Sequence, residues 1–392
     1  MIKRMHKLLS CFLAVILLTG CWDVTNIEDR GFIMGIAIDL AEEGKTNGNY
    51  HLTMTNQFAV PPGLSAPGGG SGGGGKAFVN LSASGESIYA IGQEMANKIN
   101  KLPFFEHLKV VIVSEEVAAI PQLFANVMDV FIRNRDARRG IKVIIAKEKA
   151  KDILNIQPEN EKLPARYINQ ILENSIIKTG ELRPVRVGEV HEHLLAKSSF
   201  VLPEVTSGDS ELNFVGGSVY KGDSNMLIGS LKPSEMLGLH LITGEKLGGT
   251  IEFNFKDHLT TYSIREATSR VKVNAKDPEN IDIAVTINME GEIQETFGTF
   301  ILKEPGVITA LEKEISAKVK KIADEMIKKG QKELEADIFG FADNLKKFHY
   351  HTWEKIKKDW DHGENYFAKS NVSVTVDAQV RSDGVVDQSK HK

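Results

Sequence analysis

The sequence predicts an α+β protein with several domains: an N-terminal mixed α/β domain, a helical middle segment, and a C-terminal antiparallel sheet with long helices. Three observations lead to this fold class. Apolar runs of strand length alternate with helical periodicity up to about residue 155. Two helical patterns follow at residues 163–177 and 187–197. Beyond residue 209, alternating strand patterns precede a long amphipathic helical pattern.

Length and composition indicate a folded protein. Without a predicted leader at residues 1–20, the 392-residue chain is long enough for two or three domains. Hydrophobic residues make up 42% and charged residues 26%, which is typical of globular proteins. The net charge of −4 becomes more negative when the basic leader is removed, so nucleic acid is not an expected partner.

The N-terminus has the organisation of a signal peptide. Basic residues at positions 3, 4 and 7 precede an apolar run at residues 8–18. At about 1.5 Å per helical residue, this run covers roughly half of a ~30 Å hydrocarbon core. The pattern therefore predicts a segment that is cleaved off and not a membrane-spanning helix.

The residues at the end of this leader form a bacterial lipobox, Leu18-Thr19-Gly20-Cys21. We expect cleavage between Gly20 and Cys21 and a diacylglyceryl group on the Cys21 thiol. An ordinary signal peptide with a chance cysteine is the alternative. Two acyl chains hold a protein at a membrane where a single chain binds only marginally. Cys11 leaves with the leader, so disulfides, thiol catalysis and cysteine-ligated metals are excluded.

The N-terminal domain is predicted over residues 21–155. Strands are expected at 31–39, 50–60, 76–84, 108–113 and 141–146, with helices after residue 87 and over 115–133, the latter broken at Pro121. Residues 67–75 are nearly all glycine and predict a flexible loop. This loop matches the G-x-S-x-G and G-x-G-x-x-G patterns, but no helix follows it, so neither a nucleophile elbow nor a dinucleotide site is expected.

The rest of the chain is predicted as a helical middle segment at 156–208, an α+β domain at 209–381 and a flexible tail at 382–392. The C-terminal domain is expected to contain a hairpin at 214–231, a helix at 233–243, strands at 250–255, 262–275, 281–289 and 372–380, and helices at 308–336 and 345–360. Residues 337–341 interrupt the long helical pattern, and Gly340 is interpreted as a helix C-cap.

Several short stretches, taken together, resemble one family. They are Cys21-Trp22-Asp23 with Asn26-Ile27, the strand Gly35-Ile36-Ala37-Ile38-Asp39, residues 104–116, residues 217–221 with 229–231, Glu235 and Gly238, and Asp337-Ile338-Phe339-Gly340-Phe341 followed by Trp353 and Trp360. The chain is similar to the C-subunit lipoproteins of spore nutrient-germinant receptors, the GerAC type, over almost all of its mature length. Asn26, Ala342, Lys347 and Tyr350 depart from the residues usual in that family.

This resemblance implies a non-enzymatic lipoprotein without cofactors on the outer face of the spore inner membrane. It implies a partly membrane-embedded A subunit and a transporter-like B subunit as partners. The germinant is thought to meet the B subunit in that family. Two other classes stay open: a lipoprotein that itself captures a small solute between its domains, and a secreted hydrolase.

Trp353 and Trp360 are the candidate partner-interface residues. They lie seven residues apart, on one face of the predicted helix. They pack in the core or form an anchor surface for a partner subunit, because tryptophan is enriched at interface hot spots.

Other polar clusters favour structural roles. His191-Glu192-His193 and His349-Tyr350-His351 have i, i+2 spacing, which diverges on a helix and does not predict a metal site. Glu115 and Glu116 at a helix start complement the helix dipole better than they suggest acid chemistry. The cluster Arg133, Arg135, Arg138 and Arg139 is interpreted as a solvated helix end, with lipid headgroup or partner contact as the alternative.

Overall fold

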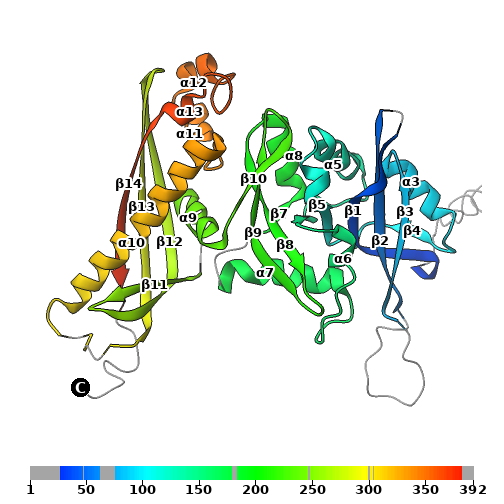
Figure 1. The fold of residues 1–392 in the computed structure, drawn as a ribbon, viewed down its shortest axis with the longest axis horizontal. Helices are drawn as coiled ribbons and strands as arrows, with labels where there is room; N and C mark the ends of the chain where they lie inside the picture. The colour runs from blue at the N-terminus through cyan, green and yellow to red at the C-terminus, as the bar shows by residue number, and fades with distance from the viewer. Residues whose placement is uncertain are drawn as a thin grey trace, which may run out of the picture.

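A computed structural model describes residues 27–46, 48–61, 76–178, 183–245, 248–298, 301–302 and 304–381. It contains two β-sheets with helices packed on them. Figure 1 shows the smaller sheet at one end of the molecule and the first three strands at the other, with β8 to β10 between them. Cys21, Gly20 and the glycine run at 67–75 lie outside the described residues.

The larger sheet has ten strands: eight in the order β10-β9-β8-β6-β5-β1-β2-β3, and two short ones, β4, which pairs with β1, and β7, which pairs with β6. The long strands are β1 (Arg30–Thr46), β2 (Asn49–Ala59), β3 (Phe78–Gly85), β5 (Val110–Ser114), β6 (Lys142–Ala146), β8 (Phe200–Ser207), β9 (Leu212–Lys221) and β10 (Met226–Leu231). The short ones are β4 (Leu102–Phe104) and β7 (Val185–Arg186). Neighbours β1, β5, β6 and β8 run parallel, and antiparallel strands flank them on both sides.

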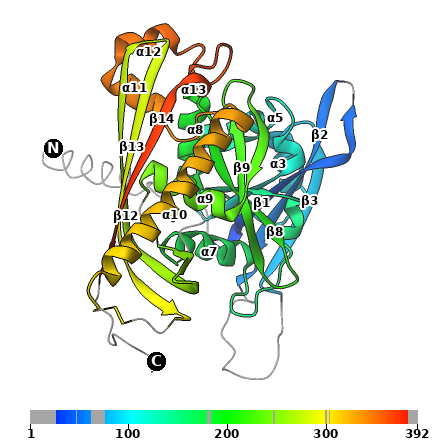
Figure 2. The ribbon, with the colours of Figure 1, turned by 60° about the vertical axis from the view of Figure 1, so that its left-hand side comes forward.

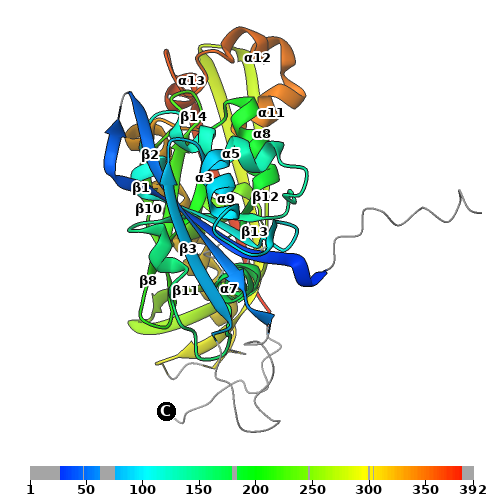
Figure 3. The same cartoon turned by 90° about the vertical axis from the view of Figure 1, so that its right-hand side faces the viewer.

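Helices cover both faces of this sheet. One face carries α3 (Ile88–Ala96), α4 (Glu115–Ala118), α5 (Leu123–Arg133) and α8 (Val187–Ala196), and the other carries α6 (Ala150–Ile153) and α7 (Pro164–Lys178). Every residue of β5 and β6 is buried as a result. Such central parallel strands are continuous apolar runs, which is why the sequence pattern identified them. Figure 3 views the molecule from the β3 side of the sheet.

The smaller sheet is built from β11 (Thr250–Phe255), β12 (His258–Asp277), β13 (Asn280–Thr296) and β14 (Asn371–Val380). The helical elements around it are α9 (Pro233–Thr243), α10 (Val307–Lys329), the π-type turn η2 (Gly330–Leu334), α11 (Phe341–Phe348), α12 (Tyr350–Ile356) and α13 (Tyr366–Lys369). Figure 2 shows α10 running diagonally across this sheet. Its Leu311, Ile315 and Val319 are completely buried in the core beneath it.

The predicted α+β class is confirmed, but sheet membership crosses the expected boundary near residue 208. Strands β9 and β10 were expected with the C-terminal domain, and they pair with β8 in the larger sheet. The expected helical middle segment contains α7 and α8 and also the strand β8. Pro203 weakens the strand signal of β8, yet it fits because pairing with β6 begins only at Glu204.

Three local expectations were wrong. The predicted helix over 345–360 is divided at His349 into α11 and α12, and Trp360 lies beyond its end. Gly340 adopts a φ of 73° at the N-cap of α11, so it is not a C-cap; Glu335 ends the preceding helical turn. Strand β14 pairs parallel to β13, so the smaller sheet is antiparallel only from β11 to β13.

Candidate functional site

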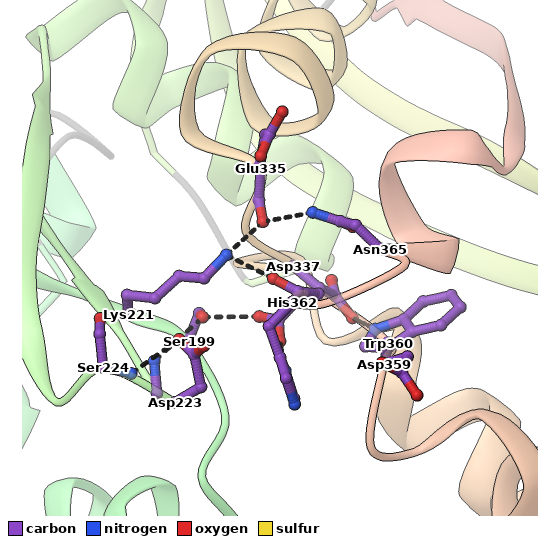
Figure 4. Close-up of polar contacts among 12 residues, drawn as sticks. Ser199, Lys221, Asp223, Ser224, Glu335, Asp337, Asp359, Trp360, His362 and Asn365 are labelled. Atoms are coloured by element: carbon purple, nitrogen blue, oxygen red, sulfur yellow. Dashed lines mark hydrogen bonds and ion pairs between the residues drawn. The ribbon is translucent and has the colours of Figure 1, made fainter.

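The candidate site lies where the two sheets meet, at the loop after η2 and the segment after α12. Lys221, at the end of β9, donates its ammonium group to the backbone carbonyls of Glu335 and Asp361. Asn365 donates to the same Glu335 carbonyl at 3.0 Å (Figure 4). A single lysine of the larger sheet therefore fixes two separate segments of the C-terminal part.

A second contact at this junction is buried. Ser199, just before β8, donates its hydroxyl hydrogen to Oδ2 of Asp361 at 2.7 Å and accepts from the backbone N–H of Gly222 at 3.2 Å. Both Ser199 and Asp361 are 5% exposed. Hydrogen bonds to charged groups contribute about 1.5–3 kcal/mol, so this contact and Lys221 hold the two parts firmly together.

Asp337 organises the turn on the C-terminal side of the junction. Its Oδ1 accepts from the backbone N–H groups of Phe339 and Phe341, each at 3.2 Å. Its Oδ2 accepts from the backbone N–H of Ala342 and from the indole Nε1 of Trp360, each at 2.7 Å. Burial raises the pKa of the Asp337 carboxyl to about 6, against the lowering effect of these donors.

Aromatic rings surround this turn. Trp360 packs at 6.0 Å from Phe367 and at 6.4 Å, edge to face, from Trp353. Phe339 stacks on Phe341 at 5.3 Å. Trp360 is 3% exposed and packs in the core of the C-terminal part, so almost none of its side chain faces solvent. Trp353 is only half-buried, and its role at a partner interface stays a prediction.

The histidine pairs do not form a metal site within the described residues, where no group of three or more His, Asp, Glu or Cys could hold an ion. His193 Nδ1 contacts the Ser198 hydroxyl at 2.9 Å, and its ring stacks on Phe200 at 4.7 Å. His349 Nε2 lies 2.8 Å from the carbonyl of Val273. These rings support local structure.

The contact between Ser198 and His193 belongs to a helix end. The backbone N–H of Ser198 donates to the carbonyl of His193, at the C-terminus of α8. In a hydrolytic triad a third group orients the imidazole through its other nitrogen. Among the described residues no carboxylate is hydrogen-bonded to His193, so the arrangement has no triad geometry.

The acidic and basic candidates lie away from the junction. Glu115 and Glu116 occupy the first turn of α4, and Glu116 is 3.3 Å from Lys149. Arg133, Arg138 and Arg139 pair with Asp129, Glu106 and Glu192, and all four arginines, Arg135 included, are exposed. The expected solvated helix end agrees with these positions.

Sequence reasoning missed Lys221, Ser199 and Asp361 as junction residues. Lys221 and Asp361 are 140 positions apart, and nothing in the local pattern around either residue indicates the other. The one local signal for this junction was the segment from Asp337 to Phe341, in which a carboxylate stands among apolar and aromatic residues and so indicates a buried hydrogen-bond acceptor. Within the described part of the chain, no helix has the length and hydropathy needed to cross a bilayer.

Comparison with known proteins identifies two matched regions. Residues 23–207 match a family described as spore germination protein, N-terminal domain, and residues 216–384 match one described as spore germination B3/GerAC like, C-terminal. Both describe spore germination proteins, and neither describes an enzyme family. The two matched regions are separated by residues 208–215, and this gap ends inside β9. The sequence families therefore divide the chain within the larger sheet, whereas the chain passes from the larger sheet to the smaller one only between β10 and β11.

Full-length relatives agree with these matches. The chain is 32% identical to spore germination protein YndF and 28% identical to spore germination protein A3, both of Bacillus subtilis (strain 168). The first alignment covers 98% of each chain, and the second covers 98% of this chain and 99% of the relative. The crystal structure of the GerBC protein has the same fold, with a TM-score of 0.61 at 18% identity, over 91% of this chain and 99% of that one.

Proposed function

Since this chain belongs to the GerAC-type family of spore germination proteins, we propose that it is a lipid-anchored subunit of a nutrient germinant receptor. It works by protein contacts with A and B subunits on the outer face of the spore inner membrane. The observation that carries the proposal is the match of both family regions along one chain whose Cys21 stands in a lipobox.

The anchor explains how such a chain stays at a membrane. The apolar leader is too short to span a bilayer, and the two acyl chains on Cys21 exceed the marginal binding of a single chain. The net charge of −4 offers no general attraction to an anionic surface. In this proposal the lipid on Cys21 supplies the attachment, and the folded part supplies the contacts.

The junction supports a role as a rigid adaptor. Lys221 and Ser199 connect the two sheets through hydrogen bonds to Glu335 and Asp361, so a force on one part is passed to the other. Near one end, Phe348 is 64% exposed and Tyr350 57% exposed, next to the half-buried Trp353. Exposed aromatic groups of this kind are typical of protein contacts, and we assign a partner subunit to this surface.

Replacement of the anchor tests this proposal. Cys21→Ala should leave an uncleaved precursor or release the protein from membranes, and spores that carry it should lose the nutrient response of this receptor. Membrane fractionation and labelling with a palmitate analogue measure the first effect, and germination assays measure the second. Cys11→Ala is the matched control, because this second cysteine lies inside the apolar run at residues 8–18 and should leave labelling unchanged.

Two results would contradict the proposal. Lipid labelling that persists in the Cys21→Ala protein would remove the anchor assignment. Normal membrane attachment of the native protein, without co-purification of any A or B subunit from detergent extracts, would remove the receptor assignment.

A further inference from the structure

A cavity of about 210 Å³ lies beside the junction, between the two sheets. It is bounded by the end of α8, the start of β8, one side of α9 and the turn that Asp337 organises. Its apolar wall is formed by Phe200, Val201, Met236, Leu239 and Phe339. A single water needs only about 10–15 Å³ of such space, so the cavity is large enough for a small organic molecule.

The opposite wall carries a carboxylate with one unsatisfied oxygen. Glu245 lies just beyond the C-cap of α9, and its Oε1 accepts from Arg183 Nε at 2.8 Å. Its Oε2 is buried and has no hydrogen-bond partner among the described residues; Nε2 of the His240 ring lies 3.6 Å away. A buried acceptor without a partner is uncommon in folded proteins. Burial also raises the pKa of the Glu245 carboxyl, as expected for a charge that lacks a full set of donors.

Arg183 does not leave a free positive group for an anionic ligand. It already pairs with Glu245 and also with Glu189. Among the described residues that line the cavity, Glu189, Glu245, Asp337 and Asp343 carry carboxyl groups. His193 also lines it, and burial lowers the pKa of its imidazole, which disfavours the charged form. The described lining thus favours a positive charge.

We propose that this cavity binds a small organic ammonium ion, whose ammonium group donates to Oε2 of Glu245 and whose apolar body packs on Phe200, Met236 and Leu239. The ammonium group supplies the missing donor and offsets the surplus of carboxylates. This site is a property of the folded chain itself and goes beyond its place in a receptor.

A titration series with one apolar body tests the ligand class. Isobutylamine, isobutanol and isovalerate share the same branched chain and carry an ammonium group, a hydroxyl and a carboxylate. Isothermal titration of the mature lipoprotein in matched detergent should show saturable one-to-one binding of isobutylamine. Isobutanol and isovalerate should bind at least about tenfold more weakly, because a charge-assisted hydrogen bond is replaced or becomes repulsive.

Three variants locate the site. Glu245→Gln should weaken isobutylamine binding about tenfold to a hundredfold, since the charged acceptor is lost. Ala342→Leu should abolish binding by filling the cavity, while the backbone N–H of Ala342 still donates to Asp337. Glu252→Gln is the matched control, because Glu252 is exposed on β11, and it should bind as the native protein does. Melting temperatures of all three verify that they fold.

The proposal is overturned if isobutylamine does not bind saturably, if the three probes bind equally, or if folded Glu245→Gln and Ala342→Leu proteins bind as well as the native one. These readouts are independent of lipid labelling at Cys21. Failure of this site therefore leaves the proposed anchoring untouched, and failure of the anchor leaves the cavity untouched.

Discussion

The two sheets of this molecule bury their residues in different ways. In β6 of the larger sheet, consecutive residues Ile144 and Ile145 are both fully buried, because helices cover both faces. In β13 of the smaller sheet, Ile287 is fully buried while the next residue, Asn288, is exposed. The smaller sheet thus keeps one face open to solvent, and only its other face carries α10.

The buried charges follow the same division. Inside the larger sheet, Lys142 reaches Asn169 and Glu173, and the 1% exposed Glu204 pairs with Lys147 at 2.8 Å. On the side of the smaller sheet, Asp337 and Asp361 are buried at the junction and not within the strands. Helices on both faces stabilise the larger sheet, whereas the smaller one depends on the hydrogen bonds of Asp337 and the aromatic packing of Trp360 at its edge.

The largest expected effect comes from replacing Trp360, which is buried beside Asp337. Trp360→Ala should cost about 3–5 kcal/mol, because it deletes a buried indole and leaves Oδ2 of Asp337 with one donor fewer. Trp353→Ala, at a half-buried site, should cost about 1 kcal/mol. Urea unfolding measures both, and the Trp353 variant should also weaken co-purification of receptor subunits.

Hydrogen exchange shows where the Trp360→Ala loss falls. Protection should fall in α10 and α11 while β5 and β6 keep theirs, since local stability follows local packing. Equal loss in both sheets would mean that the junction couples them into one cooperative unit, and the contrast between them would fail.

A second prediction compares neighbouring residues within each sheet. Ile144→Ala and Ile145→Ala should each destabilise the protein by about 2–5 kcal/mol, because both leave cavities in a covered sheet. Ile287→Ala should cost a similar amount, but Asn288→Ala should change stability by less than about 0.5 kcal/mol. Thermal and urea unfolding check this order. A loss of stability well above 0.5 kcal/mol for Asn288→Ala in the isolated protein would contradict the solvent-exposed position of this face of the smaller sheet.

A further prediction is a dependence of stability on pH at Asp337. The unfolded carboxyl titrates near 3.8 and the folded one near 6, so the folded state holds a proton over this window that the unfolded state has released. Stability should therefore fall as pH rises through the window, by up to about 3 kcal/mol from this group.

Urea unfolding at several pH values measures this dependence of stability on pH. Asp337→Asn should flatten the fall between about pH 4 and pH 6, whatever it does to stability at a single pH. Asp343→Asn changes an exposed carboxylate in the neighbouring helix α11 and should keep the native pH profile. A profile that is unchanged in Asp337→Asn would remove Asp337 as the source.

Most elements of the fold could be predicted from the sequence, because strands such as β5 and β13 and helices such as α10 carry regular apolar spacing. The division at His349 was missed since Leu345 to Trp360 keeps a helical apolar pattern across the break. The candidate site was visible only in part: the segment from Asp337 to Phe341 was recognised, but its role as an acceptor for Trp360 was not.

The sequence by itself determined the family and the type of nearly every element, and it predicts the leader and the lipobox at Cys21, because each depends on residues close together in the chain. Only the tertiary structure decided that β9 and β10 join the larger sheet, that Trp360 is buried, and that Lys221 fixes Asp361 across 140 positions. The physical reason is that backbone periodicity is local. The choice among many apolar surfaces and distant polar partners is made by packing and desolvation of the whole chain.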